Sequence, residues 1–159
     1  MHAIQLVLVL IVANGAPIVA RKVFGARLAV PLDGNRVFAD GRPILGSSKT
    51  VRGVAAALLA TPPAAVLLGL PAQVGLTVAF FAMVGDALAS FAKRRLDIPV
   101  SGRCLGLDQI PESLLPALAL QAPLALGALE ITAVVAGFIV SELALSRVLF
   151  QLNIRDRPY

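Results

Sequence analysis

Three side chains suited to metal and phosphate chemistry lie on one face of an apolar segment. Within residues 84–95, Asp86, Ser90 and Lys93 stand at i, i+4 and i+7, which places them on one side of a helix. The rise from Asp86 to Lys93 is roughly 10 Å, comparable to an extended triphosphate. An acid, a hydroxyl and a cation in this order suit Mg²⁺ and phosphate oxygens. The alternative is a structural salt bridge between Asp86 and an arginine, with the basic residues 93–95 as membrane anchors.

A second carboxylate follows in the polar segment 93–112. Mg²⁺ commonly takes one or two protein carboxylates and completes its shell with water and substrate phosphate. We therefore predict that Asp86 and Asp108 are the metal ligands. Glu112 is either a third ligand or the first-turn acid of the next helix, and the second interpretation is favoured.

A basic turn precedes the second apolar run. Residues 46–50 read Gly-Ser-Ser-Lys-Thr, but they lack the first glycine of a phosphate loop, and no α/β unit surrounds them. At a helix N-terminus such a turn still presents backbone N–H groups, hydroxyls and cations to an anion. The alternative is a polar turn with interfacial anchors. The residues predicted to bind substrate are Lys49, Thr50, Arg52, Ser90, Arg94 and Arg95.

The composition shows in which solvent this chemistry takes place. The chain has 159 residues, of which 58% are hydrophobic and only 14% charged, against about 25% charged in soluble domains. Mean hydropathy is +0.86, so lipid must be the solvent for much of the surface. The net charge of +5 would suggest nucleic acid on a soluble surface, but here the charges are gathered in a few segments. One Cys and one His argue against a disulfide framework and a zinc site.

Five apolar runs are long enough to cross a bilayer. We predict a single all-α, polytopic membrane domain with spans near 3–20, 53–70, 74–92, 113–129 and 131–150. The last two spans are separated by little more than Glu130 and should form a tight hairpin. The first run has no basic residue before it, whereas Arg21 and Lys22 follow it. This polarity indicates a retained helix rather than a cleaved signal peptide.

The basic residues determine the expected orientation. With the N-terminus outside, residues 21–52, 93–112 and the C-terminal tail share one side, and all fourteen Lys and Arg lie on or near it. Positive residues resist translocation, so this side is cytoplasmic. We expect a multi-pass protein of the cell (inner) membrane whose site, formed by loops 21–52 and 93–112, faces the cytoplasm. Asn14, inside the first span, either lines this site or bonds to a neighbouring helix.

The polar segments, taken in order, resemble the CDP-archaeol synthase family, relatives of the phosphatidate cytidylyltransferases, in a bacterial-type variant. The resemblance covers most of the chain and rests on residues 13–17, 31–33, 40–42, 46–53, 85–86, 90–95 and 107–109. Archaeal members usually read Gly-Asp-Gly-Lys-Thr where this chain has Gly-Ser-Ser-Lys-Thr at 46–50. The family's C-terminal His and Asn are replaced by Glu142 and Ser146.

The resemblance implies transfer of a cytidylyl group from CTP to a lipid phosphate, either archaeol-phosphate-like or phosphatidate-like. Asp86, Lys93 and Asp108 would be catalytic with Mg²⁺, and Asn14 would join the residues that bind substrate. The expected partners are CTP, a lipid phosphate and the bilayer, with no nucleic acid; homodimer formation is left open.

Two other functions are alternatives for a polytopic membrane protein. A phosphotransferase that consumes CDP-lipid would need a D-G-x-x-A-R signature, which is absent. A non-enzymatic transporter or scaffold is the remaining alternative, but a transporter would spread ionisable groups towards the outer side.

Overall fold

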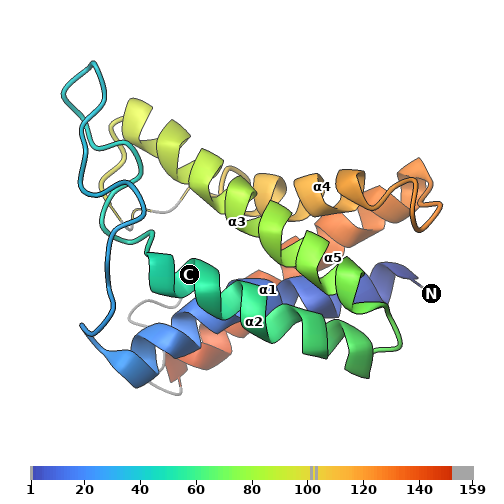
Figure 1. Cartoon of the computed structure of the whole chain (residues 1–159). Coiled ribbons are helices and arrows are strands. Elements are labelled where there is room, and N and C mark those ends of the chain that lie inside the picture. Colours follow the sequence, from blue (N-terminus) through green and yellow to red (C-terminus); the bar gives the residue numbers. More distant parts are fainter. Residues whose placement is uncertain (1, 101, 103, 152–159) are drawn as a thin grey trace.

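The computed structural model describes residues 2–100, 102 and 104–151. This part of the chain is all-α, which confirms the predicted class, and it contains five helices (Figure 1). They are α1 (His2–Phe24), α2 (Val51–Leu67), α3 (Ala72–Arg95), α4 (Gln109–Ala119) and α5 (Ala128–Gln151). Isolated β-bridges join Pro31 to Thr50 and Val37 to Pro43. The basic residues Arg103, Arg155 and Arg157 lie outside the described residues.

The helices fall into two length classes. Three are long and apolar enough to cross a membrane: His2–Phe24, Ala72–Arg95 and Ala128–Val148. The other two, α2 with 17 residues and α4 with 11, are shorter than the roughly 20 residues that span a hydrocarbon core of about 30 Å. The protein is therefore a polytopic membrane bundle in which two of the five helices are short.

The boundary between α4 and α5 differs from the prediction. A turn over residues 120–127 separates the two helices, and the predicted break at Glu130 is wrong. Glu130 lies in the first turn of α5, where its carboxylate accepts the Gly127 N–H at 3.0 Å. Pro123 lacks an amide donor and therefore favours the end of the helix before it. Composition alone cannot locate this break, because the turn is as apolar as the helices.

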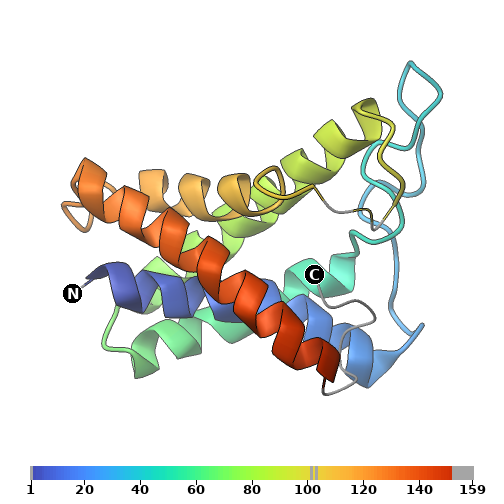
Figure 2. The same ribbon diagram turned by 180° about the vertical axis from the view of Figure 1, so that it is seen from behind.

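The core lies where α1, α3 and α5 meet. Leu10 of α1, Val78 of α3 and Phe138 of α5 are almost fully buried in one cluster. α5 runs diagonally across α1 on the face seen in Figure 2. Large side chains on the outer faces, such as Leu59 and Leu129, are exposed, as expected for surfaces that contact lipid.

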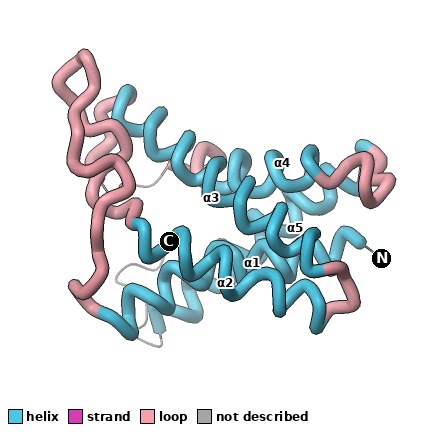
Figure 3. The backbone as a smooth tube through the Cα atoms, in the orientation of Figure 1, coloured by secondary structure: helices cyan, strands magenta, loops and turns pink. Residues whose placement is uncertain are grey.

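The connections are unequal in length. The long loop between α1 and α2 and the loop between α3 and α4 gather at one end of the bundle, whereas the other end has two shorter turns (Figure 3). α2 and α3 form an antiparallel pair that is close at its turn and diverges towards the long loops (Figures 1 and 3). The predicted polar chemistry lies at this open end.

α3 and α4 approach each other closely at Gly85. A Cβ atom added at Gly85 would overlap the Pro111 carbonyl and lie 2.7 Å from the Glu112 nitrogen. Only glycine permits this approach, since backbone atoms cannot yield as a flexible side chain would. The contact brings the first turn of α4 against the residue that follows Gly85, which is Asp86.

We expect Gly85→Ala to lower the free energy of unfolding of the detergent-solubilised protein by about 1–3 kcal/mol, because α4 must move away from α3. The thermal unfolding midpoint measures this loss. Gly15→Ala is the control, since a Cβ at Gly15 meets nothing within 4 Å. Equal midpoints for the two variants would contradict a tight contact between α3 and α4.

Candidate active site

A cavity of about 480 Å³ lined by both charged and apolar side chains opens at the end of the bundle where the long loops gather. Residues from α1, α3, α4 and α5 line it together with both long loops. The predicted site residues that it brings together are Asn14, Lys49, Asp86, Ser90, Lys93, Arg94 and Asp108. The predicted helical face of Asp86, Ser90 and Lys93 is thus a wall of one cavity.

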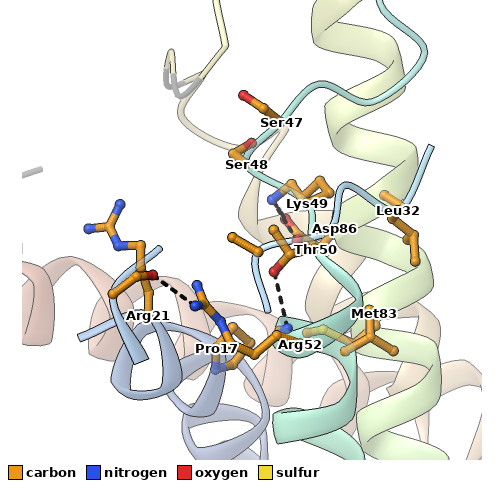
Figure 4. Close-up of a pocket in the computed structure, with 15 residues that line it drawn as sticks. Pro17, Arg21, Leu32, Ser47, Ser48, Lys49, Thr50, Arg52, Met83 and Asp86 are labelled. Carbon is orange, nitrogen blue, oxygen red and sulfur yellow. Dashed lines mark hydrogen bonds and ion pairs between the residues drawn. The ribbon is translucent and has the colours of Figure 1, made fainter. Parts of the chain in front are cut away.

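Asp86 is paired with a lysine from the basic turn. The Lys49 ammonium lies 2.5 and 2.6 Å from the two carboxylate oxygens of Asp86 (Figure 4). Both side chains are 22% exposed. The sequence left open a structural salt bridge between Asp86 and an arginine. In the structure the partner of Asp86 is Lys49, 37 positions away in the chain. The pair attaches the basic turn to the middle of a membrane-spanning helix.

Asp108 is paired with the second lysine of the site. The Lys93 ammonium lies 2.5 Å from Asp108 and also donates to the Gly102 carbonyl at 3.0 Å. Asp108 in turn accepts the Cys104 N–H at 3.0 Å. Lys93 and Arg94 are both buried and line the cavity, so they do not act as exposed membrane anchors.

Glu112 contributes a third carboxyl group. It lies in the first turn of α4, as the favoured sequence interpretation had it. The tertiary fold adds a contact that the sequence did not indicate: the Glu112 carboxyl group forms a hydrogen bond with Asp86. Two carboxyl groups in such contact must share a proton or a cation. The only local signal is the glycine that precedes Asp86, which permits the close approach of α4.

Glu142 lies at the same cavity, opposite the start of α4. The Gln109 amide donates to its carboxylate at 2.7 Å, and the Gly106 N–H donates to the Gln109 side-chain oxygen at 2.9 Å. Gln109 is buried. The sequence suggests pairing of Glu142 with Arg147 or with another helix, and Gln109 belongs to another helix, α4. This chain of hydrogen bonds ties α5 to the loop that carries Asp108.

The chain is similar to known proteins in both sequence and fold. A profile of the CarS-like family, described as CDP-archaeol synthase, matches residues 68–159, which is more than half of the chain. This chain belongs to the CDP-archaeol synthase family. It is 37% identical over 105 residues to a CDP-archaeol synthase of Saccharolobus islandicus (strain L.S.2.15 / Lassen #1), and 35% identical over 109 residues to one of Thermococcus onnurineus.

These alignments are partial, whereas a solved structure matches almost throughout. The two alignments cover 62% of this chain, but only 59% and 61% of the relatives, so the match spans about three fifths of their length. The solved structure is described as an intramembrane enzyme for archaeal membrane lipid biosynthesis. It superposes with a TM-score of 0.71 at 29% identity and covers 87% of this chain and 90% of its own.

The donor set of this family member fits a hard divalent cation. Among the described residues, no group of three or more His, Cys, Asp or Glu is placed to hold a metal. Asp86 and Glu112 are nevertheless in contact at the cavity, and two carboxylates with water and phosphate are sufficient for Mg²⁺. Asp108 lines the same cavity but is held by Lys93. The ligand pair predicted from the sequence is Asp86 with Asp108; the structure adds Glu112, which contacts Asp86, as a further candidate.

Arg95 lies apart from the described cavities. Its guanidinium stacks 4.9 Å from the Phe38 and Phe91 ring centroids and binds Asp40 at 2.7 Å. It follows Arg94, and successive residues on a helix differ by about 100° in direction, so Arg95 points away when Arg94 points in. The structure therefore does not bring Arg95 to the predicted substrate site; it fastens the loop to α3.

Thr50 and Arg52 line a smaller neighbouring cavity. Thr50 is the N-cap of α2, and its hydroxyl accepts the Gly53 N–H at 3.2 Å. The Arg52 guanidinium donates to the Gly25 and Arg27 carbonyls at 2.8 and 2.6 Å. Both residues thus have structural contacts in addition to facing a cavity.

The basic turn depends on Asp33. Its carboxylate accepts the Leu45 and Gly46 N–H groups at 2.8 and 2.9 Å and the Asn35 N–H at 3.0 Å. Partial burial raises the pKa of Asp33, but the three backbone hydrogen bonds outweigh it and leave the pKa below its ordinary value of 3.8. The ionised carboxylate is thus the form that holds the turn bearing Lys49.

We expect Asp33→Asn to lower the thermal unfolding midpoint by a few degrees at neutral pH, because the hydrogen bonds lose a charged acceptor. The folded-state pKa of Asp33 is lowered, so its contribution is complete above pH 3.8 and is lost as the pH falls through the folded value. The difference between wild type and variant should vanish there. Asp97→Asn is the control, since Asp97 is 81% exposed; a pH-independent difference for Asp33→Asn would contradict the assignment.

Proposed function

We propose that the protein transfers a cytidylyl group from CTP to a lipid phosphate, giving a CDP-lipid and pyrophosphate. The observation that carries the proposal is the single cavity in which Asp86, Asp108 and Glu112 lie among Lys49, Lys93 and neighbouring basic groups. Carboxylates suit a divalent cation, and the ammonium and guanidinium groups suit a triphosphate. Membership of a family whose named relatives are CDP-archaeol synthases supports this assignment.

The distribution of basic residues supports a cytoplasmic site. The segments 21–52 and 93–95 carry most of the described Lys and Arg, and they lie at the end of the bundle where the long loops gather (Figure 3). By the positive-inside rule this end faces the cytoplasm. The N-terminus is then outside, and the cavity is open to a water-soluble nucleotide at the inner face of the cell membrane.

The reaction itself is a displacement at phosphorus. An oxygen of the lipid phosphate forms a bond to the α-phosphorus of CTP, and the bond from that phosphorus to the bridging oxygen of the β-phosphate breaks. Pyrophosphate leaves with the electron pair, and the attacking oxygen is already anionic, so no proton has to be removed first. Positioning and charge stabilisation are sufficient for such a transfer, so no covalent protein nucleophile is required.

The chain's own residues have two tasks in this reaction. Lys49 and Lys93 neutralise Asp86 and Asp108 while no nucleotide is bound, and their flexible side chains can then turn to phosphate oxygens. Ser90 and Arg94 lie on the same wall and orient the triphosphate. Mg²⁺, held by Asp86 with Glu112 or Asp108, supplies further charge neutralisation at the phosphate oxygens when it is bound.

We expect Asp86→Asn to lower turnover by at least about 100-fold, because charge neutralisation at the reacting phosphates is a large part of such catalysis. The assay measures Mg²⁺-dependent pyrophosphate release from CTP with an ester-linked phosphatidic acid or an ether-linked dialkylglycerol phosphate. Asp97→Asn makes the same chemical change at a surface site and should retain wild-type turnover. Normal turnover in Asp86→Asn would refute the proposed site.

Glu112→Gln and Asp108→Asn together identify the second metal-binding carboxylate. If Glu112 binds the ion, Glu112→Gln should raise the Mg²⁺ concentration for half-maximal activity by about 10-fold or more. Asp108→Asn should then lower turnover without a comparable shift. The reverse pattern would assign the second ligand to Asp108, as the sequence predicted. Chelation of Mg²⁺ should abolish pyrophosphate release in the wild type, and added Mg²⁺ should restore it.

A further inference from the structure

A second, smaller cavity of about 270 Å³ adjoins the first (Figure 4). The two cavities share part of their lining, including Arg21, Lys49 and Asp86. Arg52, Val54 and other residues line only the smaller cavity, whereas Lys93 and Asp108 line only the larger one. The Lys49–Asp86 ion pair therefore forms a wall that the two adjoining cavities share.

The smaller cavity lies where α2 and α3 diverge. At their turn the helices are in tight contact, since a Cβ at Gly75 would lie 2.7 Å from Pro62 Cα and 2.8 Å from Ala65 Cβ. At the other end α2 stays against α1, where a Cβ at Gly53 would lie 3.3 Å from Pro17. α3 leans away from α2 at that end (Figures 1 and 3).

Apolar residues border the opening between these helices. Val54 of α2 and Ala87 of α3 line the cavity. Val51 and Leu88, their neighbours on the outer faces of the two helices, are 50% and 53% exposed. These outer faces belong to helices that contact lipid, so the cavity is bordered by the membrane on this side as well as by the long loop.

The lining of the smaller cavity is amphiphilic. Arg21, Lys49 and Arg52 supply positive charge, while Leu32 and Met83 supply apolar surface (Figure 4). Val54 adds to this apolar surface. The Arg52 Nε is buried and has no hydrogen-bond partner within the described structure. A ligand that satisfies both halves carries an anionic head and hydrocarbon chains.

We propose that the smaller cavity is the acceptor subsite, which receives the phosphate head of a two-chain lipid laterally between α2 and α3. The inference rests on the proposed function and assigns each substrate to its own cavity. The nucleoside triphosphate occupies the larger cavity, and the lipid phosphate approaches its α-phosphorus at the Lys49–Asp86 wall. An in-line displacement requires acceptor and leaving group on opposite sides of the phosphorus, and two cavities that meet at one wall meet this requirement.

A phosphate-bearing ligand of this cavity could instead be the leaving pyrophosphate. The apolar half of the lining distinguishes the two, because pyrophosphate gains nothing from Val54 or Met83. Binding of phosphatidic acid and of inorganic pyrophosphate to the nucleotide-free protein should therefore differ. Phosphatidic acid should bind measurably tighter, and a Val54→Phe change should weaken only its binding.

The test fills the smaller cavity without touching the larger one. We expect Val54→Phe to raise the KM for phosphatidic acid by about 10-fold or more, while the Kd of CTP, measured by titration calorimetry with Mg²⁺, stays within about twofold of wild type. Val66→Phe is the matched control, because Val66 lies on the same helix, is 55% exposed and lines neither described cavity. Ala87→Leu fills the cavity from α3 and serves if Val54→Phe does not fold.

The outcomes separate this inference from the proposed function. Equal losses of CTP and phosphatidic acid binding in Val54→Phe, or no change in either, would overturn the acceptor subsite. Pyrophosphate binding as tight as that of phosphatidic acid and equally sensitive to Val54→Phe would overturn it as well. If the wild type releases no pyrophosphate from CTP with either lipid phosphate, the proposed transfer fails, while the direct binding measurements still decide whether the cavity accepts a lipid phosphate.

Discussion

The structure depends on the neutralisation of one carboxylate, Asp86, in the middle of an apolar membrane helix. An unpaired carboxylate at this position costs several kcal/mol, and Lys49 removes the cost by binding both of its oxygens. Because Lys49 belongs to a loop, the pair also requires the loop to be ordered. Asp33 meets this requirement by accepting the amides of Leu45 and Gly46. The Asp86 carboxylate, a predicted metal ligand, thus also holds the long loop between α1 and α2 in place through Lys49.

The remaining charges of the cavity follow the same logic. Asp108 is neutralised by Lys93, and Glu112 reaches Asp86 because Gly85 has no side chain to keep α4 away. Asp86 and Asp108 are each paired with a lysine, so neither of these carboxylates is left as an uncompensated charge. The same groups can exchange partners when a nucleotide and a divalent cation bring both signs of charge. A site prepared in this way needs little reorganisation to hold an anionic transition state.

The proposed function also requires the bundle to be open both to water and to the lipid bilayer. In the proposed reaction the nucleotide is soluble in water, whereas the lipid phosphate remains in the bilayer, so the transfer would require openings of two kinds. The loops open the larger cavity to the aqueous side, and the divergence of α2 from α3 exposes the smaller one to lipid-facing helices. α2 begins at Val51, and Thr50 and Arg52 beside this end line the smaller cavity.

The sequence by itself determined that lipid surrounds much of the protein and that the fold is helical. It also determined the face of α3 that bears Asp86, Ser90 and Lys93. These properties follow from hydropathy and from the 3.6-residue period, both of which are local. Only the tertiary structure decided which residues are partners. Asp86 pairs with Lys49 and Asp108 with Lys93. Glu112 contacts Asp86, and Arg95 stacks on the Phe38 and Phe91 rings instead of lining the cavity. The break between α4 and α5 was also hidden, since an apolar turn and an apolar helix have the same composition. Charge pairing and close packing join residues far apart in the chain, and no local pattern encodes which of several equivalent lysines or acids will meet.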